Sequence, residues 1–160
     1  MVSPVLLSRY PFFSFLKPAQ LREIAKIAVE ESYDRGAILF REKDLADAFY
    51  ILLKGSVELF FTVEVEYYPE LSKELKFRVI YPGESFGISA FIEPHKLTSS
   101  ARSTEPCQVV KIKAAPLLDL CQQDDELASA LIYQVAKAAI DRLNATRLQL
   151  AATWTPASTN

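Results

Sequence analysis

Two short stretches carry the strongest structural signal in this 160-residue chain: PGESFGISA at residues 82–90 and LTSSA at residues 97–101. Gly83 and Gly87 lie between apolar runs, where a turning chain needs a positive φ angle or a close backbone approach. The backbone N–H groups around Gly87, Ser89 and Ala90 and the hydroxyls of Thr98 and Ser99 could contact an anion. These stretches predict a turn-rich ligand site.

The composition is typical of one folded domain. Hydrophobic residues make up 50% of the chain and charged residues 24%, so a core can form without disulfides or metals. The formal net charge of −2 offers no basic surplus for nucleic-acid phosphates, and we expect no direct nucleic-acid partner. No apolar run has the length of a membrane helix. Cys107 and Cys121 lack metal or redox spacing, so we expect reduced, packed thiols and a cytoplasmic location.

Periodicity divides the chain into a helical start and a β-rich middle. Residues 7–28 form the expected N-terminal helical segment, in which Leu21, Ile24 and Ala28 follow Pro18 at helical spacing. Short β-rich runs then occur at 37–40, 49–53, 57–65, 77–81, 101–102 and 107–112. Their regular spacing predicts a sandwich or barrel, with the polar segment 67–75 as a connecting loop.

Helical periodicity returns after Pro116, first to Cys121 and then in a long run from Asp124 to about Leu150. The long run has two apolar stripes, one expected to face the β-rich domain and the other a partner. The first stripe consists of Ile132, Ala136, Ala139, Leu143, Thr146 and Leu150, and the second of Leu127, Leu131, Val135 and Ala138. Residues 151–160 read as a flexible tail.

The order of these elements resembles the cyclic nucleotide-binding domain family over about residues 7–150. Segments similar to the family are Tyr10–Phe13, Gly36–Phe40, Ala48–Leu52, Gly55–Val57 and Pro82–Gly87. The resemblance implies one domain at 1–150: a mainly β fold with flanking helices, built as a double-stranded β-helix (a jelly roll or β-roll, cupin-like). It would comprise an N-terminal helical segment at 7–28, a β-roll at 29–113, and a short and a long C-terminal helix at 114–150. The family's bacterial transcription factors, similar to the catabolite activator protein, add a helix-turn-helix domain, which we do not expect here.

The resemblance also implies a phosphate-binding cassette, in which the family has a Glu for the ribose hydroxyl and an Arg for the cyclic phosphate. The matching positions hold Ile88 and Leu97, which can make neither contact, so the cassette is degenerate. Its residues by resemblance are Phe86, Gly87, Ile88, Ser89, Ala90, Leu97, Thr98 and Ser99.

Four cations are candidates to replace the missing Arg: His95, Lys96, Arg102 and Arg142. In an extended segment Lys96 points to the face opposite Leu97, and Arg102 also points away from it. Arg142, on the long helix, is therefore kept as the possible compensating cation. Alternatively, Ile88 and Leu97 fill the pocket, or the pocket holds an uncharged or apolar ligand.

The predicted function is that of a ligand-sensing regulatory domain. Its ligand would be cyclic AMP, cyclic GMP or another small molecule, and its C-terminal helix would signal to a partner or form a homodimer. The alternative is a structural or dimerisation module that has lost nucleotide binding. A barrel enzyme would need a convergent polar site, and His95 is the only histidine, so we expect no catalytic residue, metal or fixed cofactor.

Overall fold

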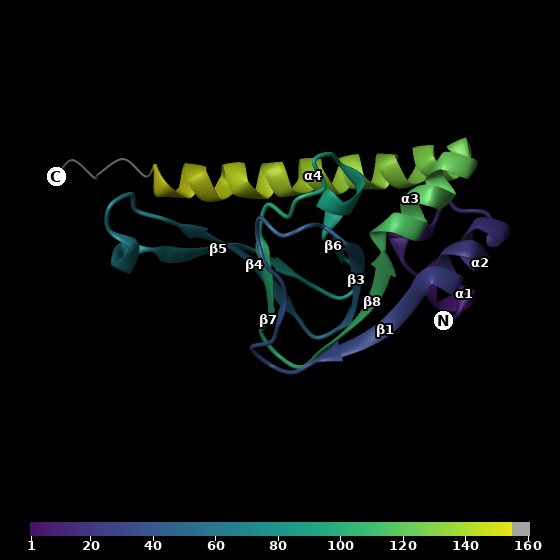
Figure 1. The fold of residues 1–160 in the computed structure, drawn as a ribbon, viewed down its shortest axis with the longest axis horizontal. Helices are drawn as coiled ribbons and strands as arrows, with labels where there is room; N and C mark the ends of the chain where they lie inside the picture. The colour runs from purple at the N-terminus through teal and green to yellow at the C-terminus, as the bar shows by residue number, and fades with distance from the viewer. Residues whose placement is uncertain (155–160) are drawn as a thin grey trace.

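Antiparallel pairing arranges the β-rich part of the chain into two sheets (Figure 1). A computed structural model describes residues 1–154, which form two four-stranded sheets in the orders β1-β8-β3-β6 and β2-β7-β4-β5. The strands are β1 Ala28–Tyr33, β2 Ile38–Phe40, β3 Ala48–Lys54, β4 Val57–Val63, β5 Lys73–Ile80, β6 Ser85–Phe86, β7 Ser100–Ser103 and β8 Cys107–Lys113. The predicted β-roll is confirmed.

Strand β3 is buried on both faces, which explains its unbroken apolar sequence. Tyr50 and Leu52 point between the sheets, whereas Phe49 and Ile51 point toward the helices. The inter-sheet core consists of Ala48, Tyr50, Leu52, Val57, Leu59, Ile80, Phe86, Ala101, Cys107 and Val109. The helix-side core consists of Val2, Leu7, Phe12, Phe13, Leu16, Leu21, Ile24, Ala25, Ala28, Ala46, Phe49, Ile51, Ala90, Phe91, Leu97, Val110, Ile112, Ala114, Leu117, Leu127, Leu131 and Val135.

The helices gather on one side and one end of the roll (Figure 1). They are α1 Pro4–Ser8, α2 Pro18–Ile27, α3 Ala114–Gln123 and α4 Asp125–Thr153, with 3-10 turns η1 Pro11–Phe13, η2 Pro69–Leu71 and η3 Ile88–Phe91. None of the helices within residues 1–154 is both long and apolar enough to cross a membrane.

The first turn of α4 is capped by Asp124, which also binds a side chain of α2. The Asp124 carboxylate accepts hydrogen bonds from the Leu127 N–H at 2.9 Å and from Gln20 Nε2 at 2.8 Å, which ties α4 to α2. These hydrogen bonds favour the charged form and lower the pKa of Asp124, with Gln20 as the largest cause. The start of α4 is therefore fixed to the body of the protein.

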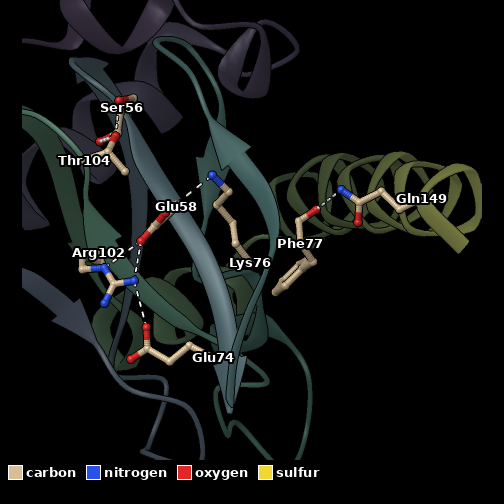
Figure 2. A network of polar contacts seen from close by, with 8 residues as sticks. All are labelled: Ser56, Glu58, Glu74, Lys76, Phe77, Arg102, Thr104 and Gln149. Carbon is tan, nitrogen blue, oxygen red and sulfur yellow. Dashed lines mark hydrogen bonds and ion pairs between the residues drawn. The ribbon is translucent and has the colours of Figure 1, made fainter. Parts of the chain in front are cut away.

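The two stripes of α4 differ in burial. Leu127, Leu131 and Val135 of the second stripe lie in the helix-side core, whereas Leu143 and Leu150 of the first stripe are exposed, a choice between the stripes that the sequence left open. The C-terminal part of α4 runs beyond the roll beside the β4–β5 hairpin, where Gln149 Nε2 donates to the Phe77 carbonyl at 2.9 Å (Figures 1 and 2). The helix is thus buried at its start and open along its later turns.

Several predicted bounds were wrong. The expected helical segment 7–28 is divided among α1, η1 and α2, and Ala28 already begins β1, a largely exposed polar strand with a weak apolar pattern. The expected loop 67–75 contains η2, and β5 starts at Lys73 because the exposed hairpin tolerates charged residues in paired strands. α4 extends past residue 150 to Thr153; the remainder of the expected tail, residues 155–160, lies outside the described part of the chain.

Candidate functional site

The cassette begins at a tight turn that only glycine fits. Gly87 has a φ of +72°, and a Cβ atom there would lie 3.0 Å from the Ala48 carbonyl oxygen and 3.1 Å from Tyr50 Cδ2. The preceding Phe86 is fully buried, and its ring stacks on that of Tyr50 with a centroid separation of 5.0 Å. The turn that leads into η3 is therefore held rigidly against β3.

A cavity of about 490 Å³ lies between this turn and α4; we call it the cassette cavity. The β-roll contributes Leu59 and Phe77 to its wall. The cassette and the following loop contribute Ile88, Ser89, Ile92, Glu93, Pro94, Lys96, Thr98 and Ser99, and α4 contributes Ile132, Val135, Ala136, Ala139 and Arg142. Its volume is within the range typical of small-molecule sites, about 300–1,000 Å³.

The predicted cassette residues separate into two groups. Ile88, Ser89, Thr98 and Ser99 line the cassette cavity. Phe86, Ala90 and Leu97 belong to the two cores. In addition, the Ala90 N–H donates to the Gly87 carbonyl at 3.1 Å inside η3, so it is not a free donor for a ligand. About half of the motif therefore holds the fold, and the other half forms the cavity wall.

Leu97 does not fill the cavity, contrary to the alternative considered from the sequence. Its N–H donates to the Asp44 carbonyl at 2.9 Å, and its carbonyl accepts from the Lys43 N–H at 2.8 Å, while its side chain is 6% exposed and packs in the helix-side core. Alternation then directs the neighbours Lys96 and Thr98 to the cavity. The expectation that Lys96 points away from the ligand site was wrong, because Leu97 rather than Lys96 faces away.

Arg142 reaches the site from α4. It lines the cassette cavity, and its Nη2 donates to the Ser85 carbonyl at the start of β6. Burial of the guanidinium, and to a lesser extent the nearby charge of Arg78, lowers the pKa of Arg142 to about 10, although Glu84 acts in the opposite direction. Arg142 still carries its positive charge at neutral pH, as the compensating role requires.

The other two candidate cations do not line the cavity. His95 Nδ1 lies 3.0 Å from the Ala90 carbonyl oxygen. Arg102 binds Glu58 and Glu74 (Figure 2), with Nε 2.7 Å from Glu58 Oε1 and Nη2 3.0 Å from Glu74 Oε2. Its guanidinium also lies 4.4 Å from the centre of the Phe60 ring. Arg102 therefore belongs to an ion-pair network on the sheet.

The charge pattern of the cassette cavity suits a ligand with one anionic group. Lys96 and Arg142 oppose the single carboxylate of Glu93, and three hydroxyls add hydrogen-bonding groups to a wall that is otherwise largely apolar. The sequence alone did not assign Glu93 or the α4 residues Ile132, Ala136 and Ala139 to this wall. The last three belong to the first of the two apolar stripes expected on the long helix, so their helical spacing was the available signal.

The remaining reactive side chains have ordinary surroundings. Among residues 1–154 no group of three or more His, Cys, Asp or Glu residues is placed to hold a metal. Cys107 and Cys121 are unpaired, and burial raises the pKa of both thiols. This keeps them protonated near neutral pH, which agrees with packed rather than reactive cysteines.

Comparisons with known proteins identify the family of this fold. The sequence model of the cyclic nucleotide-binding domain matches residues 30–124. A crystal structure of a candidate cyclic nucleotide-binding protein from Geobacter metallireducens GS-15 is 38% identical in sequence, with a TM-score of 0.78, over 89% of this chain and 99% of that chain. The regulatory domain of Toxoplasma gondii PKA, co-crystallised with cAMP, has a TM-score of 0.71 over 85% of this chain and 48% of that chain. At 18% identity, it shares the fold.

A curated relative is the cAMP-dependent protein kinase regulatory subunit of Blastocladiella emersonii. It is 27% identical over 127 residues, and the match covers 75% of this chain and 30% of the relative. The chain therefore corresponds to a minor part of that longer regulatory protein.

Proposed function

Because the chain belongs to the cyclic nucleotide-binding domain family, we propose that its cassette cavity binds a cyclic nucleotide and that the domain is a ligand-sensing regulator. The observation that carries this proposal is the cavity itself, which is open beside the cassette and lined by two cations, Lys96 and Arg142. Neither cation occupies the family's Arg position, yet both are directed to the same cavity. The cyclic phosphate, a single negative charge, would lie between them.

Ile88 in place of the family's Glu changes the contacts that are available to the ribose of a cyclic nucleotide. Ile88 lines the cavity at that position and offers an apolar contact, so the hydroxyls of Ser89, Thr98 and Ser99 provide the polar contacts of the cassette side. Neutral hydrogen bonds contribute less than charge-assisted ones. We therefore propose binding that is weaker and less selective between cyclic AMP and cyclic GMP than a cassette with Glu and Arg would give.

A ligand in this cavity would act on α4. Five residues of α4 line the cavity, and the same helix carries the exposed apolar residues Leu143 and Leu150 farther along. If the ligand makes better contacts with one position of α4, the fraction of molecules with α4 in that position increases when the ligand binds. We propose that α4 transmits binding to a partner, and that its exposed stripe forms a homodimer through helix pairing.

The structural alternative remains distinct from this proposal. The exposed stripe of α4 alone supports a dimerisation module without a ligand, because heptad-like spacing needs no cavity. Such a module would self-associate but would not respond to nucleotides. Its self-association would weaken in a Leu143→Ala, Leu150→Ala variant, as measured by sedimentation, without any effect of added cyclic AMP.

Calorimetric titration with cyclic AMP, cyclic GMP and uncharged adenosine tests the binding proposal. We expect both cyclic nucleotides to bind and adenosine to bind more weakly, since it lacks the phosphate. Lys96→Gln should weaken binding of the cyclic nucleotides by about tenfold, which is the loss of one charge-assisted contact. Lys54→Gln, on the exposed end of β3, is the matched control and should leave affinity unchanged. Absence of binding by the unmodified protein would refute the proposal.

A further inference from the structure

A second cleft, of about 240 Å³, lies where α4 passes η1 and the turn between β5 and β6. We call it the rear cleft. Arg78 of β5 and Glu84 of the turn form one wall, and Gln134, Lys137 and Arg142 of α4 form another. The rear cleft shares Arg142 with the cassette cavity, but its other lining residues differ.

Two residues that line the rear cleft each carry a buried hydrogen-bond donor without a partner. Among the buried side-chain nitrogen and oxygen atoms of residues 1–154, Arg78 Nε and Gln134 Nε2 have no hydrogen-bond partner. Both residues line the rear cleft, and Gln134 is only 7% exposed. A buried donor without an acceptor is costly, and a small turn of each side chain toward an acceptor in the cleft would remove that cost.

The charges around the rear cleft also favour an acceptor that is negatively charged. Arg78, Lys137 and Arg142 bring three positive charges, while Glu84 and Asp141 bring two negative ones. Each oxygen of Glu84 already has a partner within the protein, since Oε1 lies 2.6 Å from Arg78 Nη2 and Oε2 accepts from the Tyr81 N–H at 2.7 Å. With Asp141 as the second carboxylate, the three cations of the cleft still exceed its carboxylates by one charge.

The surroundings of Arg142 point in the same direction. Burial and the neighbouring Arg78 charge together lower the pKa of Arg142, which means that its positive charge is incompletely compensated. An anion between the two guanidinium groups would supply the missing compensation.

We propose that the rear cleft is a second binding site, specific for a small oxyanion of the phosphate type. The oxyanion accepts hydrogen bonds from Arg78 Nε and Gln134 Nε2 and lies against the charge of Arg142. Arg142 contacts the Ser85 carbonyl beside the cassette, so an oxyanion that draws on its guanidinium also affects the cassette cavity. This coupling rests on the proposed nucleotide function, whereas oxyanion binding in the rear cleft does not.

Titration with inorganic phosphate at constant ionic strength, maintained with sodium chloride, tests the proposal. Calorimetry should show saturable binding to the unmodified protein. Gln134→Met keeps the side-chain volume but removes the unsatisfied donor, so it should fold at least as well and bind phosphate at least about tenfold more weakly. Gln134→Glu has the same shape and adds a negative charge, and should abolish binding. Thermal melting of each variant without phosphate confirms that it folds.

Lys96→Gln is the control that separates the two sites. It should leave phosphate binding intact while it weakens binding of cyclic nucleotides, because Lys96 lines only the cassette cavity. The proposal is overturned if phosphate does not bind the unmodified protein, if Gln134→Met binds it equally well, or if Lys96→Gln loses it.

Discussion

The two faces of the cassette segment differ in what they do, although their residues alternate along the chain. Phe86, Ala90 and Leu97 face the cores and are at most 6% exposed, whereas Ile88, Ser89 and Lys96 line the cassette cavity. The core-facing residues fix the shape of the turn, and the cavity-facing residues are available to a ligand. A motif position is therefore informative about binding only when the face to which it points is known.

The largest effect is expected where a charge is placed on the core face. Leu97→Arg restores the residue that the family motif has, but it would bury an unpaired guanidinium in the helix-side core. We expect the free energy of unfolding to fall by more than about 3 kcal/mol, measured by urea denaturation. Leu97→Met is the control and should cost less than about 1.5 kcal/mol. A stable Leu97→Arg protein with raised nucleotide affinity would show that residue 97 faces the ligand.

A smaller loss is expected at the turn that joins the two faces. Gly87→Ala introduces a Cβ atom at a φ of +72°, 3.0 Å from the Ala48 carbonyl oxygen. Strain of this kind costs about 1–3 kcal/mol, which urea denaturation would detect. Gly36→Ala is the matched control, since its φ is also positive, +84°, but no atom lies within 4 Å of the added Cβ. Equal losses at both glycines would mean that the close approach to Ala48 does not matter.

On the cavity face, a charge should be tolerated. Ile88→Glu restores the other residue of the family motif, and Ile88 is only half-buried and lines the cassette cavity. We expect the free energy of unfolding to fall by less than about 1.5 kcal/mol, because part of the side chain keeps its access to water. Calorimetry should show tighter binding of cyclic AMP through the ribose hydroxyl. A loss as large as that of Leu97→Arg would remove the contrast between the faces.

The smallest effect on stability is expected at Lys96, which is exposed at the cavity. Lys96→Arg keeps the charge and should change the free energy of unfolding by less than about 0.5 kcal/mol. Its planar group can make two parallel hydrogen bonds to a phosphate, so we expect cyclic AMP to bind more tightly. Unchanged affinity in calorimetric titration of this variant would place the phosphate away from residue 96.

Much of the fold could be predicted from the sequence, because the relevant signals are local. The runs around Phe49 and Val57 alternate with glycine turns, and helical spacing identifies two apolar stripes on α4, although only the structure shows that the stripe with Leu127 and Leu131 is the buried one. Strand β1 was missed because Glu30, Glu31 and Ser32 give it little apolar pattern. That strand forms through pairing with β8, which is distant in sequence.

The site was less predictable because it depends on direction and on contacts between distant segments. The sequence correctly indicates that Lys96 and Leu97 point to opposite faces, but it does not say which face meets the cavity. That choice follows from pairing of residues 96 and 97 with Asp44 and Leu45. Likewise, Arg142 is 57 positions from Ser85, and only the packing of α4 on the roll brings them together.

The most direct test is an NMR titration of isotope-labelled protein with cyclic AMP, in which the backbone amide shifts show where the ligand lies. The account predicts that the largest shifts occur at Ser89, Thr98 and Ser99 and along α4 from Ala136 to Arg142. It also predicts that the amide of core-facing Phe86 shifts less than that of Ser89. No shifts at all, or shifts centred on Arg78 and Gln134 in the rear cleft, would contradict nucleotide binding in the cassette cavity.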